Sequence, residues 1–174
     1  MIKLKKLMTE SVWNRKFGEP LPTLEDTMKA HQKKTITEGT RWLVGIEQPN
    51  GKITSTYGHY DGYPAFNGKV LRDNYDTVEK VKELIDGGDM SCTWTNSGWN
   101  NETLPETGAL YYTMRNETLE SNAPRLDKDM EEFFSDGEEY SYIFRNGNWF
   151  AYDMHQFEDM VAPEPVEIPA GPLA

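Results

Sequence analysis

The chain has 174 residues, a formal net charge of −11 and a hydrophobic fraction of 37%, and aromatic residues make up 12% of it. This length fits one domain with tails. The negative charge argues against a nucleic-acid partner, because binding phosphates requires lysine and arginine, and it also disfavours an anionic membrane surface. No apolar run reaches the roughly 18 residues of a membrane span.

The charge is unevenly distributed along the chain. Residues 1–39 hold eight Lys/Arg against five Asp/Glu, whereas residues 40–174 hold ten against twenty-four. Such asymmetry indicates separate roles for the two segments. We predict a basic leader over residues 1–39 with a short helix, an α+β domain over residues 40–155, and a proline-rich tail over residues 156–174 that is extended or disordered.

Two Asn-Gly pairs indicate β-hairpins. The first, Asn50-Gly51, separates β-forming segments at residues 41–47 and 53–57. The second, Asn146-Gly147, separates residues 140–144 from 149–152 and predicts a type I′ turn. The sequence therefore predicts a single α+β domain whose antiparallel sheet is built on these two hairpins, with two or three helices packed on it.

The helices are expected mainly between the hairpins. Pro64 suits the first turn of a helix over roughly residues 64–75. Asp76, with Glu79 three residues later, predicts the capped start of a second helix that ends at Gly87-Gly88. The four apolar residues expected on one face of it are Val78, Val81, Leu84 and Ile85.

The remaining elements give weaker signals. We expect strands at residues 90–95 and 109–114. Residues 115–139 carry nine Asp/Glu against three Lys/Arg, which predicts a solvated loop with a short helix near residues 129–134. Cys92 is the only cysteine, so an internal disulfide is impossible and a reducing compartment is favoured.

The strongest functional signal lies at the end of the first hairpin, in residues 57–64. Three tyrosines, a histidine and an aspartate surround a glycine turn there, at the junction of a strand and a helix. Loops of this kind, held by a rigid scaffold, often carry binding residues. We therefore predict a ligand-binding site formed by Tyr57, His59, Asp61, Tyr63 and Trp99, where the Trp99 indole lies in a loop-like segment suited to stacking on a flat ligand.

Two other interpretations of this loop remain open. In a purely structural one, Asp61 caps the following helix and His59 only satisfies local hydrogen bonds. In a catalytic one, His59 is a general base oriented by Asp61, although no serine or cysteine occupies a recognisable nucleophile position. We favour binding over catalysis and expect no enzyme activity.

Neither a metal site nor a cofactor is predicted. The three histidines, His31, His59 and His155, lie far apart, and no metal-ligand spacing is present. The arginines also look too scattered along the sequence for a phosphate site, namely Arg41, Arg72, Arg115 and Arg145. One of them close to the loop at residues 57–64 would change that interpretation.

Several of these segments together resemble a known group of proteins. The residues that carry the resemblance include Tyr57, His59, Asp61-Gly62-Tyr63-Pro64, Gly68-Lys69-Val70-Leu71 and the closing hairpin from Tyr140 to Trp149. Over roughly residues 40–89 and 139–153 the chain resembles a family of small uncharacterised proteins of tailed bacteriophages. Members often carry a cysteine and a tryptophan where this chain has Gly58 and Tyr60, which argues against thiol chemistry here. The resemblance implies a viral origin and no particular reaction.

The leader is similar to the capsid-targeting peptides of large contractile-tailed phages, which are cleaved after glutamate and before a small residue. Glu10 and Ser11 would be that processing site. We expect an accessory protein of the host cytoplasm that sequesters a small nucleotide-like ligand or a host protein as a counter-defence. The alternative is an internal or structural virion protein, packaged in the phage capsid through its leader. A homo-oligomer is compatible with either.

Overall fold

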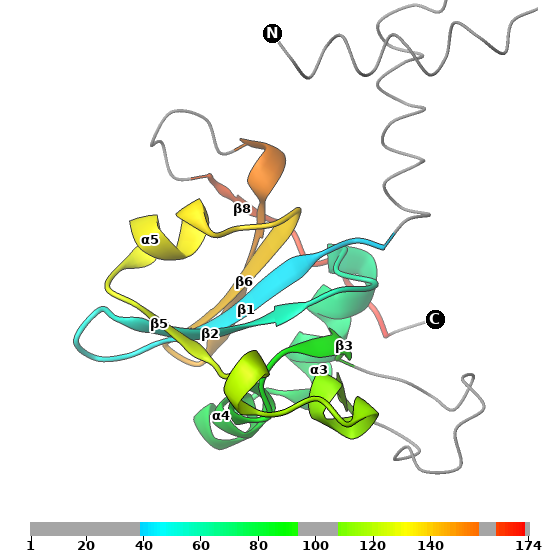
Figure 1. Cartoon of the computed structure of the whole chain (residues 1–174). Helices are drawn as coiled ribbons and strands as arrows, with labels where there is room; N and C mark the ends of the chain where they lie inside the picture. The colour runs from blue at the N-terminus through cyan, green and yellow to red at the C-terminus, as the bar shows by residue number, and fades with distance from the viewer. Residues whose placement is uncertain (1–38, 94–107, 157–162, 173–174) are drawn as a thin grey trace, which may run out of the picture. The chain divides into compact units, whose positions relative to one another are not determined.

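Two antiparallel hairpins form the centre of the fold. Strand β1 (Trp42–Glu47) pairs with β2 (Ile53–Gly58), and β6 (Tyr140–Arg145) pairs with β7 (Asn148–Asp153). These elements come from a computed structural model that describes residues 39–93, 108–156 and 163–172. Strands β1 and β6 lie side by side, which joins the hairpins into one sheet (Figure 1). The predicted α+β class is confirmed.

The sheet is mixed, whereas an antiparallel sheet was predicted. Within the described ranges its strand order is β4-β3-β2-β1-β6-β7-β8, and β5 also pairs with β2. The added strands are β3 (Met90–Cys92), β4 (Leu110–Tyr111), β5 (Arg125–Asp127) and β8 (Pro165–Val166). The pairs β1–β6 and β2–β3 are parallel. Long crossover connections permit this pairing, because the chain can return to the sheet in the same direction.

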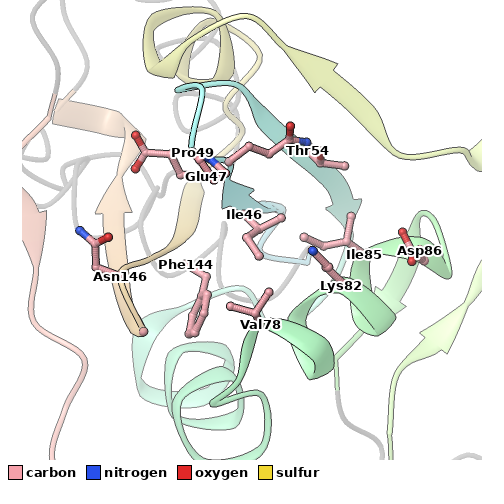
Figure 2. Close-up of a pocket in the computed structure, with 12 residues that line it drawn as sticks. Ile46, Glu47, Pro49, Thr54, Val78, Lys82, Ile85, Asp86, Phe144 and Asn146 are labelled. Atoms are coloured by element: carbon pink, nitrogen blue, oxygen red, sulfur yellow. Dashed lines mark hydrogen bonds between the residues drawn. The ribbon is translucent and has the colours of Figure 1, made fainter.

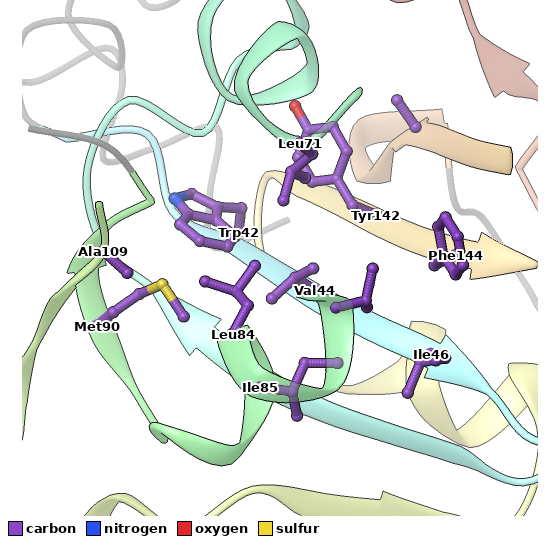
Figure 3. Close-up of a cluster of buried hydrophobic side chains, with 12 residues drawn as sticks. Trp42, Val44, Ile46, Leu71, Leu84, Ile85, Met90, Ala109, Tyr142 and Phe144 are labelled. Atoms are coloured by element: carbon purple, nitrogen blue, oxygen red, sulfur yellow. The ribbon is translucent and has the colours of Figure 1, made fainter. Parts of the chain in front are cut away.

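The central strand β1 is buried on both faces, which explains its uninterrupted apolar sequence. On one face it packs beneath α3 (Lys69–Asn74) and α4 (Val78–Asp86), in a cluster that includes Trp42, Val44 and Ile46 (Figure 3). On the other face Leu43 joins the apolar cluster to which α5 (Met130–Ser135) contributes two phenylalanines. The sheet is therefore the middle of three layers.

The helix boundaries differ in detail from the prediction. The first helix begins at Pro64 as a π-helical turn, η1 (Pro64–Gly68), and continues as α3. Thr77, and not Asp76, caps α4, because its hydroxyl accepts from the Lys80 amide at 3.3 Å. Asp76 instead forms an ion pair with the Lys80 ammonium at 2.6 Å. Val78 is 42% exposed and does not belong to the buried face.

The acidic segment is more ordered than expected. After β4 the chain forms two 3₁₀ turns, η2 (Tyr112–Arg115) and η3 (Glu120–Asn122), so the predicted strand at residues 109–114 ends early. Strand β5 was missed by the prediction of a solvated loop. Its Asp127 is buried and accepts a hydrogen bond from the Ser55 hydroxyl at 3.2 Å, which ties the segment to β2.

The proline-rich tail continues the sheet. A last 3₁₀ turn, η4 (Met154–Gln156), follows β7, and β8 then pairs with β7. Ile168 packs on the core cluster, and Arg72 of α3 donates to the carbonyls of Pro169 and Gly171 at 2.8 and 2.9 Å. The described part of the tail is thereby fixed to the domain in an extended conformation.

Trp42 determines the path of the chain after β2. Its indole is fully buried, and an added Cβ at Gly58 or Gly62 would lie 2.0 or 2.2 Å from its ring atoms. Neither glycine has a positive φ, so it is space, and not backbone conformation, that requires glycine at both positions. The chain from Gly58 to Gly62 therefore closes around the indole.

Gly58→Ala should lower the free energy of unfolding by about 3 kcal/mol or more, because the new methyl group overlaps a ring that cannot move. Gly51→Ala is the matched control. A Cβ there meets no atom within 4 Å, and only the φ of +80° opposes it, at about 1 kcal/mol. Urea unfolding of both variants tests this prediction, and equal losses would contradict it.

Candidate functional site

The loop at residues 59–62 is held through its backbone. The amides of Tyr60 and Gly62 donate to the carbonyls of Ser91 and Thr40 at 2.8 and 2.9 Å. Two core side chains hold the loop carbonyls: the Trp42 indole donates to that of Tyr60 at 2.9 Å, and the Tyr142 hydroxyl to that of Gly62 at 2.5 Å. The loop is thus a rigid support for the side chains that it carries.

At the turn itself, Asp61 has a φ of +58° and is exposed. The helix that follows is capped by Tyr63, without a side-chain hydrogen bond. Asp61 therefore does not cap this helix, as the purely structural interpretation had it. Asp61 instead occupies the left-handed position of the turn, a backbone conformation that aspartate tolerates.

Tyr57 and His59 form a hydrogen-bonded pair. Their side chains share one face of the strand end, because Gly58 between them faces Trp42. The Tyr57 hydroxyl lies 2.7 Å from Nδ1 of His59. The Tyr60 ring meets the imidazole edge-on at 4.5 Å between centroids, and a Cβ added at Gly39 would lie 3.0 Å from it. Three of the loop's polar aromatic side chains are therefore adjacent.

Two arginines act on the imidazole of His59. The β1–β2 register ends at the pair of Trp42 and Gly58, and Arg41 and His59 are the next residues beyond that pair. Arg115 comes from η2, where its guanidinium lies 4.0 Å from the ring centre of Tyr112. Asp89 ties η2 to β2, because its carbonyl accepts from the Tyr112 amide and its carboxylate from the Tyr57 amide.

We call this surface the arginine–tyrosine patch. Its members are exposed or partly exposed and lie around the end of β2. They are Arg41, Tyr57, His59, Tyr60, Tyr112 and Arg115. The sequence prediction included only two of them. The charges of Arg41 and Arg115 both act on His59, so two of the scattered arginines lie within electrostatic reach of the loop. Arg115 is also ion-paired with Glu117 at 2.9 Å.

The patch is electrostatically unusual for so acidic a protein. Partial burial lowers the pKa of His59 below its ordinary 6.5, and the charges of Arg41 and Arg115 lower it further, opposed by Glu138. Burial also raises the pKa of Tyr57 to about 12. At neutral pH the pair is therefore an uncharged phenol beside an imidazole that is mainly neutral, and two arginines, Arg41 and Arg115, and two carboxylates, Asp89 and Glu138, act on it.

Two of the other predicted site residues, Asp61 and Tyr63, belong to the described part of the chain. Asp61 and Tyr63 influence each other, since the Asp61 carboxylate adds to the effect of burial in raising the pKa of Tyr63. Among the described residues no hydrogen bond joins His59 to Asp61, so the catalytic interpretation, with Asp61 orienting His59, finds no hydrogen bond to support it. Trp99, Glu10 and Ser11 lie outside the described residues.

A hollow lies at the opposite end of the hairpins, away from the patch. It is a groove of about 670 Å³ between α4 and the turns of both hairpins, with Ile46, Ile85 and Phe144 on its floor (Figure 2). Its rim carries both signs of charge, and Glu47 there is already paired with Arg145. This groove offers apolar area without a convergent set of polar groups.

No group of three or more His, Cys, Asp or Glu side chains suited to a metal ion occurs in the part of the chain that the structure describes. Within the same residues, no helix has the length and apolar character needed to cross a bilayer.

Comparison with known proteins gave no match: no protein-family model, no curated protein and no solved structure corresponds to this chain. The site must therefore be interpreted from its own geometry.

The charge of Arg41 should be measurable at His59. In an NMR titration of the imidazole, Arg41→Ala should raise the pKa of His59, because a positive neighbour that disfavours the imidazolium is removed. Arg125→Ala is the control, since Arg125 is exposed on β5 and acts instead on Asp127. A His59 titration that is the same in all three proteins would contradict the described geometry.

Proposed function

We propose that this protein is a binding protein whose arginine–tyrosine patch takes a small nucleotide-like ligand. The observation that carries the proposal is the cluster of Tyr57, His59 and Tyr60 on a fixed loop, with the charges of Arg41 and Arg115 acting on the imidazole in a chain whose net charge is −11. Positive charge gathered against such a background favours an anion at this place. Arginine also suits phosphate well, because its planar fork of donors matches the phosphate oxygens.

The tyrosines supply the second half of the recognition. The ring of Tyr60, which is 40% exposed, stands beside the imidazole, and Tyr112 carries Arg115 on its ring face. Aromatic side chains next to arginine bind nucleobases by stacking, at about 1–3 kcal/mol per base. A ligand that combines a flat ring with a phosphate would use both kinds of group.

The rigidity of the loop supports binding more than catalysis. Its backbone hydrogen bonds and the Trp42 clamp fix the patch before a ligand arrives, so little entropy is lost on binding. In the phage-infected cell that the sequence resemblance implies, a stoichiometric binder of this kind would sequester a nucleotide-like signal of the host.

A thermal-shift panel of nucleoside mono-, di- and cyclic phosphates tests the proposal on the full chain. A ligand at about 100 times its Kd should add about 2.7 kcal/mol, which corresponds to a rise in Tm of several degrees. Arg41→Ala and Arg115→Ala should each reduce the shift, since each removes a charge from the proposed site.

Two exposed cations away from the patch serve as controls. Arg125→Ala changes β5, and Lys82→Ala changes the rim of the groove beside α4. Neither should alter the shift. A shift lost equally in all four variants, or no shift with any member of the panel, would refute a nucleotide site at the patch.

A further inference from the structure

The described part of the tail, residues 163–172, lies on the domain as an extended peptide (drawn in red in Figure 1). Among the described residues, its ladder with β7 covers only Pro165 and Val166. Val166 and Ile168 pack on the core cluster, whereas Glu167 between them is exposed. This alternation is typical of a peptide strand that is added to the edge of a sheet.

Ile168 fills a shaped position on the domain. A Cβ placed on Gly68 would lie 3.1 Å from Cγ2 of Ile168 and 3.5 Å from the ring of Tyr142. Gly68 has a φ of −59°, so its backbone conformation does not require glycine. The absence of a side chain there makes room for the isoleucine. The domain therefore has a defined place for one apolar side chain of the tail.

Two cations of α3 bind the backbone of the tail. The Arg72 guanidinium donates to the carbonyls of Pro169 and Gly171 at 2.8 and 2.9 Å. The Lys69 ammonium donates to the carbonyl of Pro172 at 3.2 Å. Because every peptide has carbonyls, these contacts recognise an extended backbone and no particular side chain.

The tail is itself suited to such a site. Four prolines in residues 163–172 fix φ near the extended value, so this segment loses little conformational entropy when it is bound. Proline also lacks an N–H group, so the peptide offers mainly carbonyls, which are the groups that Arg72 and Lys69 bind. The Arg72 fork is oriented by an ion pair with Asp73 at 2.8 Å.

None of these contacts depends on the tail belonging to the same chain. Six residues, 157–162, connect η4 to the tail. The pairing with β7, the packing beside η1 and the carbonyl contacts with α3 would be the same for the tail of another copy. Exchange of an identical element between two copies is a low-cost route to a symmetric dimer for this reason.

We propose that the surface formed by the edge of β7, Gly68, Lys69 and Arg72, which we call the tail site, is a peptide-binding site for the tail of a second copy. Two copies then exchange residues 163–172 and form a dimer through reciprocal contacts. A second copy is the occupant because its tail is identical to the peptide that the site holds. This proposal is independent of the nucleotide site.

Binding of the tail within its own chain competes with the exchange. A short linker gives a tethered tail an effective concentration on the order of millimolar at its own site. Wild-type chains should therefore be monomers when dilute and form dimers only as the chain concentration approaches this range. A pair of variants that removes the competition is the sharper test.

The experiment mixes two full-length variants. Ile168→Asp releases the tail of one chain and leaves its tail site intact, because a carboxylate is not tolerated against the apolar core. Lys69→Ala combined with Arg72→Ala removes the three carbonyl contacts from the other chain and leaves its tail intact. In analytical ultracentrifugation, neither variant should associate with itself, whereas the mixture should form one-to-one dimers.

Ala170→Asp is the matched control, since residue 170 is exposed and the same carboxylate is added to the tail. A chain with this substitution keeps its own tail bound and should not associate with the double variant. The NMR signals of residues 163–172 verify that the tail is released in Ile168→Asp. Ile168→Ala, which is milder, replaces that variant where it fails to fold.

Dimers that form only in the mixture support the exchange. A mixture that stays monomeric, with both variants folded and the tail released, overturns it. Binding of a synthetic peptide of residues 163–172 to the Ile168→Asp chain, without dimers in the mixture, would show that a free peptide and not a second copy occupies the site, which also overturns the exchange. Dimers of either variant alone would place the contact elsewhere and overturn it as well.

Discussion

The buried indole of Trp42 is the interaction on which the site depends. It lies at the start of the central strand, fills the space beside two glycines and donates its only hydrogen bond to the loop carbonyl of Tyr60. A tryptophan buried so completely needs a partner for its N–H group. Here that partner is the loop at residues 59–62. The packing of the core therefore also determines the geometry of the patch. Displacing the ring would move Tyr57 and His59 together with the loop.

The sequence was sufficient to predict the first hairpin, but not the register in which its two strands pair. Asn50-Gly51 correctly placed the first hairpin. A two-residue turn at these positions would have set Arg41 opposite Tyr60. In the structure, Gly51 at φ +80° closes a turn in which its amide donates to the Gln48 carbonyl, and this register instead pairs Trp42 with Gly58 and makes Arg41 and His59 the next residues beyond that pair. A shift of one residue reverses the face of every side chain on a strand, and local sequence does not determine it.

Arg115 could not have been placed from the sequence for a different reason. It lies more than fifty residues from His59 along the chain, on a short turn whose position depends on the carboxylate and carbonyl of Asp89. Long-range contacts of this kind follow from the assembled sheet and not from periodicity. The distinction matters for function. The tyrosines and the histidine could be selected from the sequence, whereas the position of the arginines, on which the proposed class of ligand depends, could not.

A single measurement addresses the central claim that the ligand site is the patch supported by Trp42. It is an amide and side-chain NMR titration of the full chain with the nucleotide that gives the largest thermal shift. The account predicts that the largest changes fall on residues 39–41, 57–62 and 112–115. Changes confined to the groove of Ile46, Ile85 and Phe144, or spread without a focus, would contradict it.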